Sequence, residues 1–104
     1  MDTIKPSYSI RILESFEYWL NSIRDNQTRL RLSRRLEKAS RGNLGDVKPV
    51  GAGVYEMREF FGPGWRMYYI QRGGDLIVML GGGDKSTQQR DIELAKERAA
   101  QLED

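Results

Sequence analysis

The sequence contains no cysteine and no histidine. Without cysteine the protein can form no disulfide bond, no thiolate nucleophile and no Cys/His zinc site, and without histidine it has no imidazole general base. The carboxylates are scattered along the chain, and the cleft we predict below is cationic, which repels a divalent ion. We therefore expect no metal site and no cofactor.

Long apolar runs are also missing, because no segment approaches the length needed to cross a bilayer. Residues 1–6 lack the basic run followed by an apolar stretch that marks a leader sequence. We expect a cytoplasmic protein with no membrane partner. With 104 residues, the chain fits a single domain over residues 1–104.

Positive charge is concentrated in one part of the chain. Lys and Arg total 17 against 15 Asp and Glu, but residues 24–41 hold seven cations and only two acids. Such a basic segment suits a polyanion or an acidic partner, although an ordinary solvated helix face would look the same. The cations that we consider for polyanion binding are Arg31, Arg34, Arg35 and Lys38.

The spacing of apolar residues predicts the order β-α-α-β-β-β-α and an α+β fold. Alternation predicts a strand over 7–12. Helical spacing of apolar residues, with Phe16 in a first stripe and Leu32 in a second, predicts two helices that form a hairpin, and Gly42 with Gly45 ends the second helix. Residues 44–53, rich in Gly with one Pro, indicate a loop that exposes Lys48.

Three further strands and a helix complete this predicted order. Alternating residues after 53 and after 64 predict a β-hairpin whose turn is formed by residues 60–64 (FFGPG). The apolar run 76–80 predicts a central strand buried on both faces. Residues 81–83, all glycine, indicate a turn into the last helix, for which Ser86 and Gln89 form a capping-box pattern.

Polar side chains are predicted to gather on one face of this hairpin. If Met57 and Met67 point into the core, alternation places Arg58 and Arg66 on the opposite, open face, where they could converge on one phosphate. The residues expected on that open face are Glu56, Arg58, Arg66 and Tyr68. Tyr68 could stack on a base. The alternative is a surface lattice of Arg, Glu and Tyr side chains.

Lys85 offers a second anion contact, because it follows three glycines and precedes a predicted helix N-terminus. A tight strand-to-helix turn explains the same glycines without any ligand. The segment is not a P-loop, since Asp84 stands where that motif requires glycine.

Four ordered segments resemble a known family: residues 45–50 (GDVKPV), 53–58 (GVYEMR), 62–69 (GPGWRMYY) and 82–92 (GGDKSTQQRDI). Together they resemble the addiction-module killer proteins of the RelE/ParE superfamily of type II toxins, which are also described as HigB-like or phage-derived. The resemblance implies an N-terminal strand and a helical hairpin packed on an antiparallel sheet, with a C-terminal helix.

The resemblance also implies a toxin that is neutralised by a cognate antitoxin, that binds operator DNA only through the antitoxin complex, and that inhibits translation by cutting mRNA on the ribosome. Such a metal-independent endoribonuclease uses the RNA 2′-hydroxyl as its nucleophile. The implied catalytic residues are Arg58, Arg66, Lys85, Tyr68 and Glu56, and the implied RNA-binding residues are Lys48 and Gln88. We expect the cations of the basic segment, Arg31, Arg34, Arg35 and Lys38, to bind RNA as well.

The proton-transfer group is the least defined part of this mechanism. Tyr68 or Glu56 would orient the 2′-hydroxyl or accept its proton, and a tyrosine or lysine would need cationic neighbours to depress its pKa. Two alternatives remain open. One is a ParE-like DNA gyrase inhibitor without nuclease activity, and the other is a weakly toxic binding module that acts with its antitoxin as a DNA-bound repressor.

Overall fold

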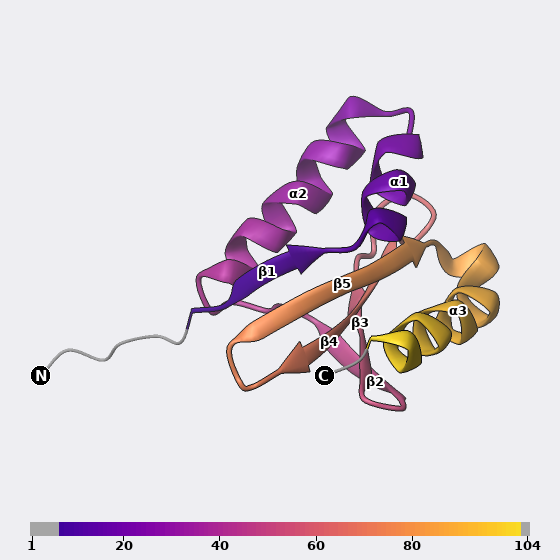
Figure 1. Ribbon diagram of the computed structural model, residues 1–104. Helices are drawn as coiled ribbons and strands as arrows, with labels where there is room; N and C mark the ends of the chain where they lie inside the picture. Colours follow the sequence, from indigo (N-terminus) through magenta and orange to yellow (C-terminus); the bar gives the residue numbers. More distant parts are fainter. Residues whose placement is uncertain (1–6, 103–104) are drawn as a thin grey trace, which may run out of the picture.

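The computed structural model describes residues 7–102, so the prediction about residues 1–6 lies outside the described part. The described residues form three helices and five strands (Figure 1). Their order is β1 (Ser9–Ile12), α1 (Glu14–Ser22), α2 (Asn26–Ser40), β2 (Val47–Gly51), β3 (Val54–Arg58), β4 (Arg66–Arg72), β5 (Leu76–Gly83), a short 3-10 turn η1 (Lys85–Thr87) and α3 (Gln88–Gln101). The predicted α+β class is confirmed. Within residues 7–102, no helix is long and apolar enough to span a membrane.

The five strands form one mixed sheet in the order β1-β5-β4-β3-β2. Strands β2, β3, β4 and β5 pair antiparallel, whereas β1 runs parallel to β5. The antiparallel sheet that the resemblance implied is formed by β2–β5, and the N-terminal strand β1 joins its edge in the parallel direction. The apolar run 76–80 does lie inside the sheet, between β1 and β4, as its burial on both faces predicted.

The outer strand β2 was not predicted, because residues 44–53 have the composition of a loop. Pro49 has no N–H to donate, and an outer strand tolerates this because only one of its sides is paired. The following turn has positive φ at Gly51, Ala52 and Gly53, and only glycine adopts such values at little cost. The loop prediction is therefore wrong for Val47–Gly51.

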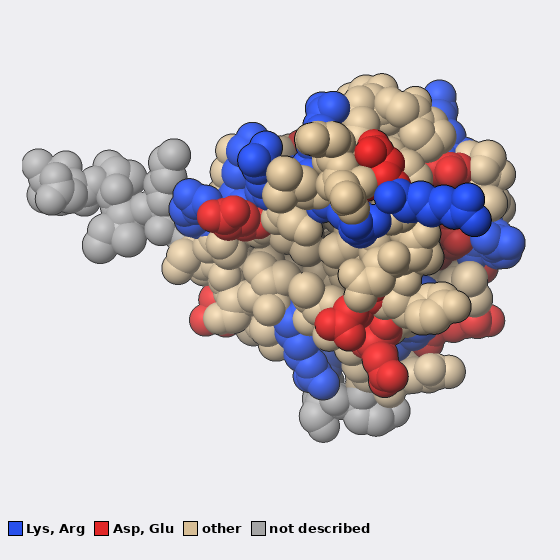
Figure 2. All heavy atoms as spheres, turned by 90° about the horizontal axis from the view of Figure 1, so that it is seen from above, with Lys and Arg blue, Asp and Glu red and all other residues tan. Residues whose placement is uncertain are grey.

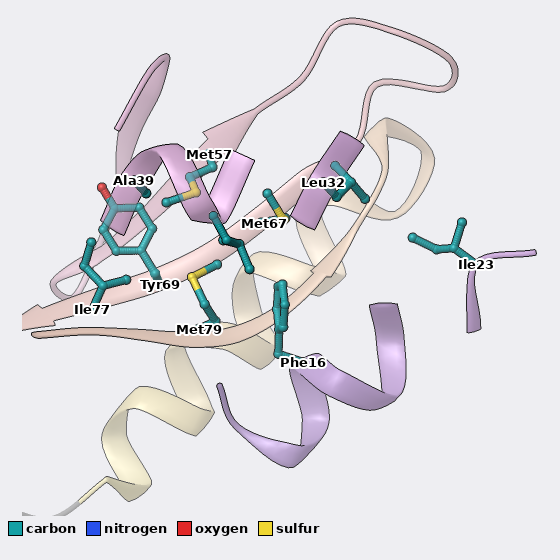
Figure 3. Packing of buried hydrophobic residues seen from close by; sticks show 10 residues of the cluster. Phe16, Ile23, Leu32, Ala39, Met57, Met67, Tyr69, Ile77 and Met79 are labelled. Carbon is teal, nitrogen blue, oxygen red and sulfur yellow. The ribbon is translucent and has the colours of Figure 1, made fainter. Parts of the chain in front are cut away.

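Helices cover both faces of the sheet. On one face α1 and α2 pack over a cluster that includes Phe16 and Leu32, drawn in Figure 3. On the other face α3 packs through Ala95 over a second cluster that includes Tyr68 and Leu80. Figure 1 shows the sheet between these two helical layers. The sequence had suggested that the face opposite Met57 and Met67 is open. That prediction is wrong, because α3 covers this face.

The three consecutive glycines belong to β5 instead of forming a turn after it. A Cβ atom on Gly82 would lie 2.5–2.6 Å from the Trp19 ring, on the side where α1 packs. On the α3 side, Gly81 is met by Arg98 and Gly83 by Asp91. The glycines therefore allow helices on both faces to approach the end of β5 closely.

We expect Gly82→Ala to lower the free energy of unfolding by about 1–3 kcal/mol, because the methyl group overlaps a rigid indole. Gly81→Ala is the matched control, since its methyl group meets only the flexible end of Arg98, and its cost should be clearly smaller. Urea unfolding of both variants measures the difference. Equal losses would contradict this packing role for Gly82.

Helix α3 begins differently from the predicted capping box. Asp84 is the cap of η1, and its Oδ1 accepts hydrogen bonds from the Ser86 amide at 2.8 Å and from Ser86 Oγ at 2.5 Å. Thr87 precedes α3 and makes no side-chain cap, but its hydroxyl donates to Asp91 Oδ2 at 2.5 Å. The prediction of Ser86 as the N-cap is wrong. Lys85 is the first residue of the 3-10 turn and lies three residues before α3.

Candidate functional site

A buried polar cluster lies under the start of α3. Its members are Glu56, Arg66, Tyr68 and Gln88. Glu56 is 1% exposed, and its Oε2 accepts hydrogen bonds from the Tyr68 hydroxyl at 3.0 Å and from Gln88 Nε2 at 2.8 Å. Glu56 and Tyr68 are direct partners in the β3–β4 register, which brings them together on the α3 face. Gln88, predicted to bind RNA, is thus a partner of Glu56.

Arg66 connects this cluster to the β3–β4 loop, residues 59–65. The residue is 4% exposed, and its Nη1 donates to the carbonyl oxygens of Glu59 at 2.8 Å and Trp65 at 3.1 Å. Its Nε lies 3.8 Å from Glu56 Oε1 and makes no hydrogen bond within the described residues. Arg66 therefore holds the loop in place from inside the protein. The prediction that it lies on an open face is wrong.

Tyr68 is fully buried, so the proposed stacking of a base on it is wrong. Burial, followed by the negative charge of Glu56, raises the pKa of Tyr68 well above its usual value. The mechanism inferred from the sequence required the opposite shift for a tyrosine base. Tyr68 stays protonated and donates to Glu56, and neither residue is exposed to accept a proton from RNA.

The buried tyrosines predict a loss of stability at high pH. Burial raises the pKa of Tyr69 to about 12 and that of Tyr68 in the same direction. The unfolded chain releases these protons near pH 10, so the folded state binds more protons above that pH. Stability should be fully retained below pH 10 and should fall as the pH rises toward 12.

Urea midpoints measured from pH 8 to 12 check this expectation. The double variant Tyr68→Phe/Tyr69→Phe should show a shallower decline than the wild type over that interval, because it lacks both phenols. Parallel curves would contradict the assignment of the decline to these tyrosines.

Three cations remain accessible near the cluster, and we call them the sheet-end cations: Arg58, Lys48 and Lys85. The Arg58 side chain is 32% exposed and forms an ion pair of 3.1 Å with Asp46. Lys48 is exposed on β2 and pairs in register with Glu56, which places it on the same face as Arg58. Lys85 is exposed, and its stem lies beside Gly64, as does Arg66 Nη1.

The predicted basic helix is α2, and its cations line a hollow of about 230 Å³ together with Glu59. Arg35 is not free to bind RNA there, because it donates to the carbonyl oxygens of Leu44, Asp46 and Arg58 and pairs with the Glu59 carboxylate. This use of Arg35 corrects its predicted role. Basic side chains with acidic residues among them occupy the surface on the side of the helical hairpin (Figure 2). The remaining cations of the hollow are Arg31, Arg34 and Lys38.

Sequence reasoning missed two residues of this region. Asp46 was assigned to a loop but is the ion-pair partner of Arg58. Phe60 was assigned to a turn, yet it is 72% exposed, and its ring centroid lies 5.6 Å from the guanidinium of Arg58 and 5.7 Å from that of Arg66. The adjacent Phe61 packs on the core, so two neighbouring aromatic residues have opposite environments. Two adjacent phenylalanines directly before the turn at residues 62–64 were the sequence signal for an exposed aromatic residue, because one tight loop rarely buries both.

Two solved structures share this fold. The free form of a mutant of the Escherichia coli toxin RelE matches with a TM-score of 0.69 at 12% identity, covering 89% of this chain and 97% of that one. The toxin–antitoxin complex RelBE2 of Mycobacterium tuberculosis matches with a TM-score of 0.62 at 19% identity, covering 76% and 99%. At these identities the likeness establishes the fold, and the expected RelE-like architecture is confirmed.

A closer sequence relative is found in Haemophilus influenzae strain Rd, an uncharacterized protein that is 37% identical over 93 residues. The match covers 89% of this chain and 94% of that protein. The model of the family described as phage-derived protein Gp49-like (DUF891) matches residues 19–100, which run from the end of α1 into α3 and include every residue of the candidate site. The chain therefore belongs to the phage-derived Gp49-like family.

Proposed function

We propose that the protein is the toxin of a type II toxin–antitoxin module, and that it inhibits translation by cutting mRNA on the ribosome. The fold shared with RelE and with the RelBE2 complex supports the toxin assignment. The observation that carries the RNA part is the placement of cations on both sides of one loop. Arg58 and Lys85 flank residues 59–65, and the α2 hollow meets the same loop at Glu59.

This arrangement suits a single-stranded polyanion. Arg58 presents a planar guanidinium, which matches the geometry of two phosphate oxygens, and Lys85 and Lys48 add point charges nearby. Arg31, Arg34 and Lys38 are exposed on α2 and extend the positive surface toward ribosomal RNA. Such contacts predict binding that weakens steeply with added salt.

The reaction we propose requires little from the protein itself. The RNA 2′-hydroxyl attacks the adjacent phosphorus, the bond to the 5′-oxygen breaks, and the products carry a 2′,3′-cyclic phosphate and a 5′-hydroxyl. Arg58 stabilises the charge on the phosphate oxygens. Solvent water takes the 2′-hydroxyl proton, and Lys85 donates a proton to the leaving 5′-oxygen and regains one from solvent. The ribosome aligns the 2′-hydroxyl for in-line attack. No step passes through a metal ion.

The buried polar cluster has a positioning role in this proposal. Glu56, Tyr68 and Gln88 fix Arg66, and Arg66 holds the loop beside Arg58. In this proposal Arg58 and Lys85 act as the catalytic residues. Lys48 remains an RNA-binding candidate.

The cognate antitoxin is the proposed protein partner, and operator DNA would be bound only through the antitoxin complex. An acidic antitoxin segment would complement the exposed α2 cations and mask them from RNA. We place this activity in the cytoplasm, where the ribosome and mRNA are found.

Induction of the chain in bacterial cells, with and without its antitoxin, tests the proposed function. We expect growth arrest and new mRNA 5′ ends inside translated regions, both suppressed by the antitoxin. Arrest with intact messages and a loss of plasmid supercoiling would instead identify a gyrase inhibitor. No arrest would favour the repressor module.

A further inference from the structure

Phe60 is an exposed aromatic side chain on a loop that is otherwise firmly held. On one side of it, the Glu59 amide donates to the Trp65 carbonyl at 2.9 Å, and the Glu59 carbonyl accepts from Arg66. The Glu59 carboxylate also pairs with Arg35. The backbone at position 59 is therefore fixed from both β4 and α2.

The other side of Phe60 is held as well. The Phe61 carbonyl accepts from the Gly64 amide at 3.1 Å, and Arg31 lies 3.6 Å from the centroid of the Phe61 ring. The Lys85 amide reaches the Pro63 carbonyl at 3.4 Å, which ties η1 to the same loop. Because both neighbours of Phe60 are anchored, its ring is presented to solvent at a defined place.

The surroundings of the ring indicate which ligand it suits. Arg58 and Arg66 are direct partners in the β3–β4 register, so both guanidinium groups approach the ring from the sheet. The solvent-facing part of the ring remains available for a planar group. A nucleobase offers such a plane, and its own phosphate would reach the cations beside the ring.

We propose that Phe60 is a stacking site for one nucleobase of single-stranded RNA, next to the phosphate that Arg58 binds. This inference rests on the proposed function and adds a base-contacting residue to it. The base-stacking role that the sequence suggested for Tyr68 is thus assigned to Phe60. Stacking of this kind tolerates all four bases, because each has a π-face, so Phe60 would position the strand more than select its sequence.

An apolar protein segment is the competing occupant, and the charges argue against it. To cover Phe60, such a segment would also cover the guanidinium of Arg58, which lies 5.6 Å from the ring centroid, is 32% exposed and is paired with Asp46. Taking this partly exposed ion pair out of water under an apolar cover is costly. RNA brings a phosphate with every base and satisfies the ring and the cations together.

Binding of a single-stranded RNA oligonucleotide containing 2-aminopurine, measured by fluorescence at low salt, tests the stacking site. Stacking quenches this base, so the wild type, Phe60→Tyr and Phe60→Trp should all quench it. Phe60→Leu keeps an apolar side chain without a π-face, and we expect it to lose the quenching and to bind about five- to 150-fold more weakly. Tyr18→Leu is the matched control, because Tyr18 is 80% exposed on α1 and should not affect either signal.

The outcomes separate this inference from the proposed function when cleavage of ribosome-bound mRNA is measured on the same variants. Loss of quenching and slower cleavage in Phe60→Leu alone would support the stacking site. If Phe60→Leu binds, quenches and cleaves like the wild type while Arg58→Ala fails to cleave, stacking is overturned and the RNase stands. If Phe60→Leu weakens only capture by the antitoxin, Phe60 belongs to a protein interface. If no variant, nor the wild type, cleaves or binds RNA, both proposals fail.

Discussion

Replacement of Arg58 by alanine should slow cleavage of ribosome-bound mRNA by about 100- to 1,000-fold, the usual cost of removing one group that stabilises transition-state charge. Arg58 is partly exposed and lies in an ion pair with Asp46 at the end of β3. Of the two arginines paired across β3 and β4, Arg58 is accessible to solvent, whereas Arg66 is buried. Single-turnover cleavage of a short message in a programmed ribosome measures the rate.

Two further variants give this experiment its controls. Arg58→Lys keeps the charge without the planar fork, so its rate should lie between those of the wild type and Arg58→Ala. Arg41→Ala removes an exposed cation at the end of α2 that pairs with Glu37 and does not belong to the proposed site. This variant should leave the rate unchanged. If Arg41→Ala and Arg58→Ala were equally slow, general charge instead of a phosphate contact would explain the loss.

Replacement of Glu56 by alanine should have the largest effect on stability, about 3–5 kcal/mol, as expected when one partner of a buried charged pair is removed. The change removes the acceptor of the Tyr68 hydroxyl and of Gln88 Nε2, and it leaves Arg66 buried without its acidic neighbour. Urea unfolding with near-ultraviolet circular dichroism would report the loss.

The matched control is Glu37→Ala, which breaks the exposed pair between Glu37 and Arg41 on α2. Exposed pairs contribute little, so the control should cost less than about 1 kcal/mol. A Glu56→Ala protein as stable as this control would contradict the structural role of the buried polar cluster. It would also reopen a role of Glu56 in proton transfer.

Local patterns predicted the individual elements well. Apolar spacing placed Phe16 on the buried side of α1 and Leu32 on that of α2, and both are fully buried. The unbroken apolar run 76–80 marked a strand inside the sheet, because both of its faces contact helices. These features depend on neighbours close in sequence or on burial alone, which a single sequence records.

The position of α3 could not be predicted from the sequence, and most errors follow from it. Strand alternation correctly put Glu56 and Tyr68 on one face, but whether that face is open depends on where a helix beginning 20 residues after Tyr68 docks. The same helix explains Gly81 and Gly83, whose Cβ positions Arg98 and Asp91 occupy. Long-range packing thus changed candidate catalytic side chains into buried supports.

The sequence predicted the accessible cations of the candidate site but not the long-range contacts that decide which other side chains reach its surface. Lys48 and Lys85 are exposed and Arg58 is partly exposed, as their proposed contacts with RNA require. Arg35 was grouped with its helical neighbours by charge, whereas the fold turns it toward carbonyl groups at the ends of β2 and β3. Phe60 was overlooked because turn composition does not reveal which of two adjacent aromatic residues faces solvent.

Cleavage of mRNA by the purified protein in a programmed ribosome, with fragment ends identified, tests the central claim most directly. We predict a cut in the occupied coding region that leaves a 2′,3′-cyclic phosphate and a 5′-hydroxyl, that persists in EDTA-treated protein, and that is abolished by pre-incubation with antitoxin. An intact message under these conditions, together with inhibition of DNA gyrase by the same preparation, would contradict it.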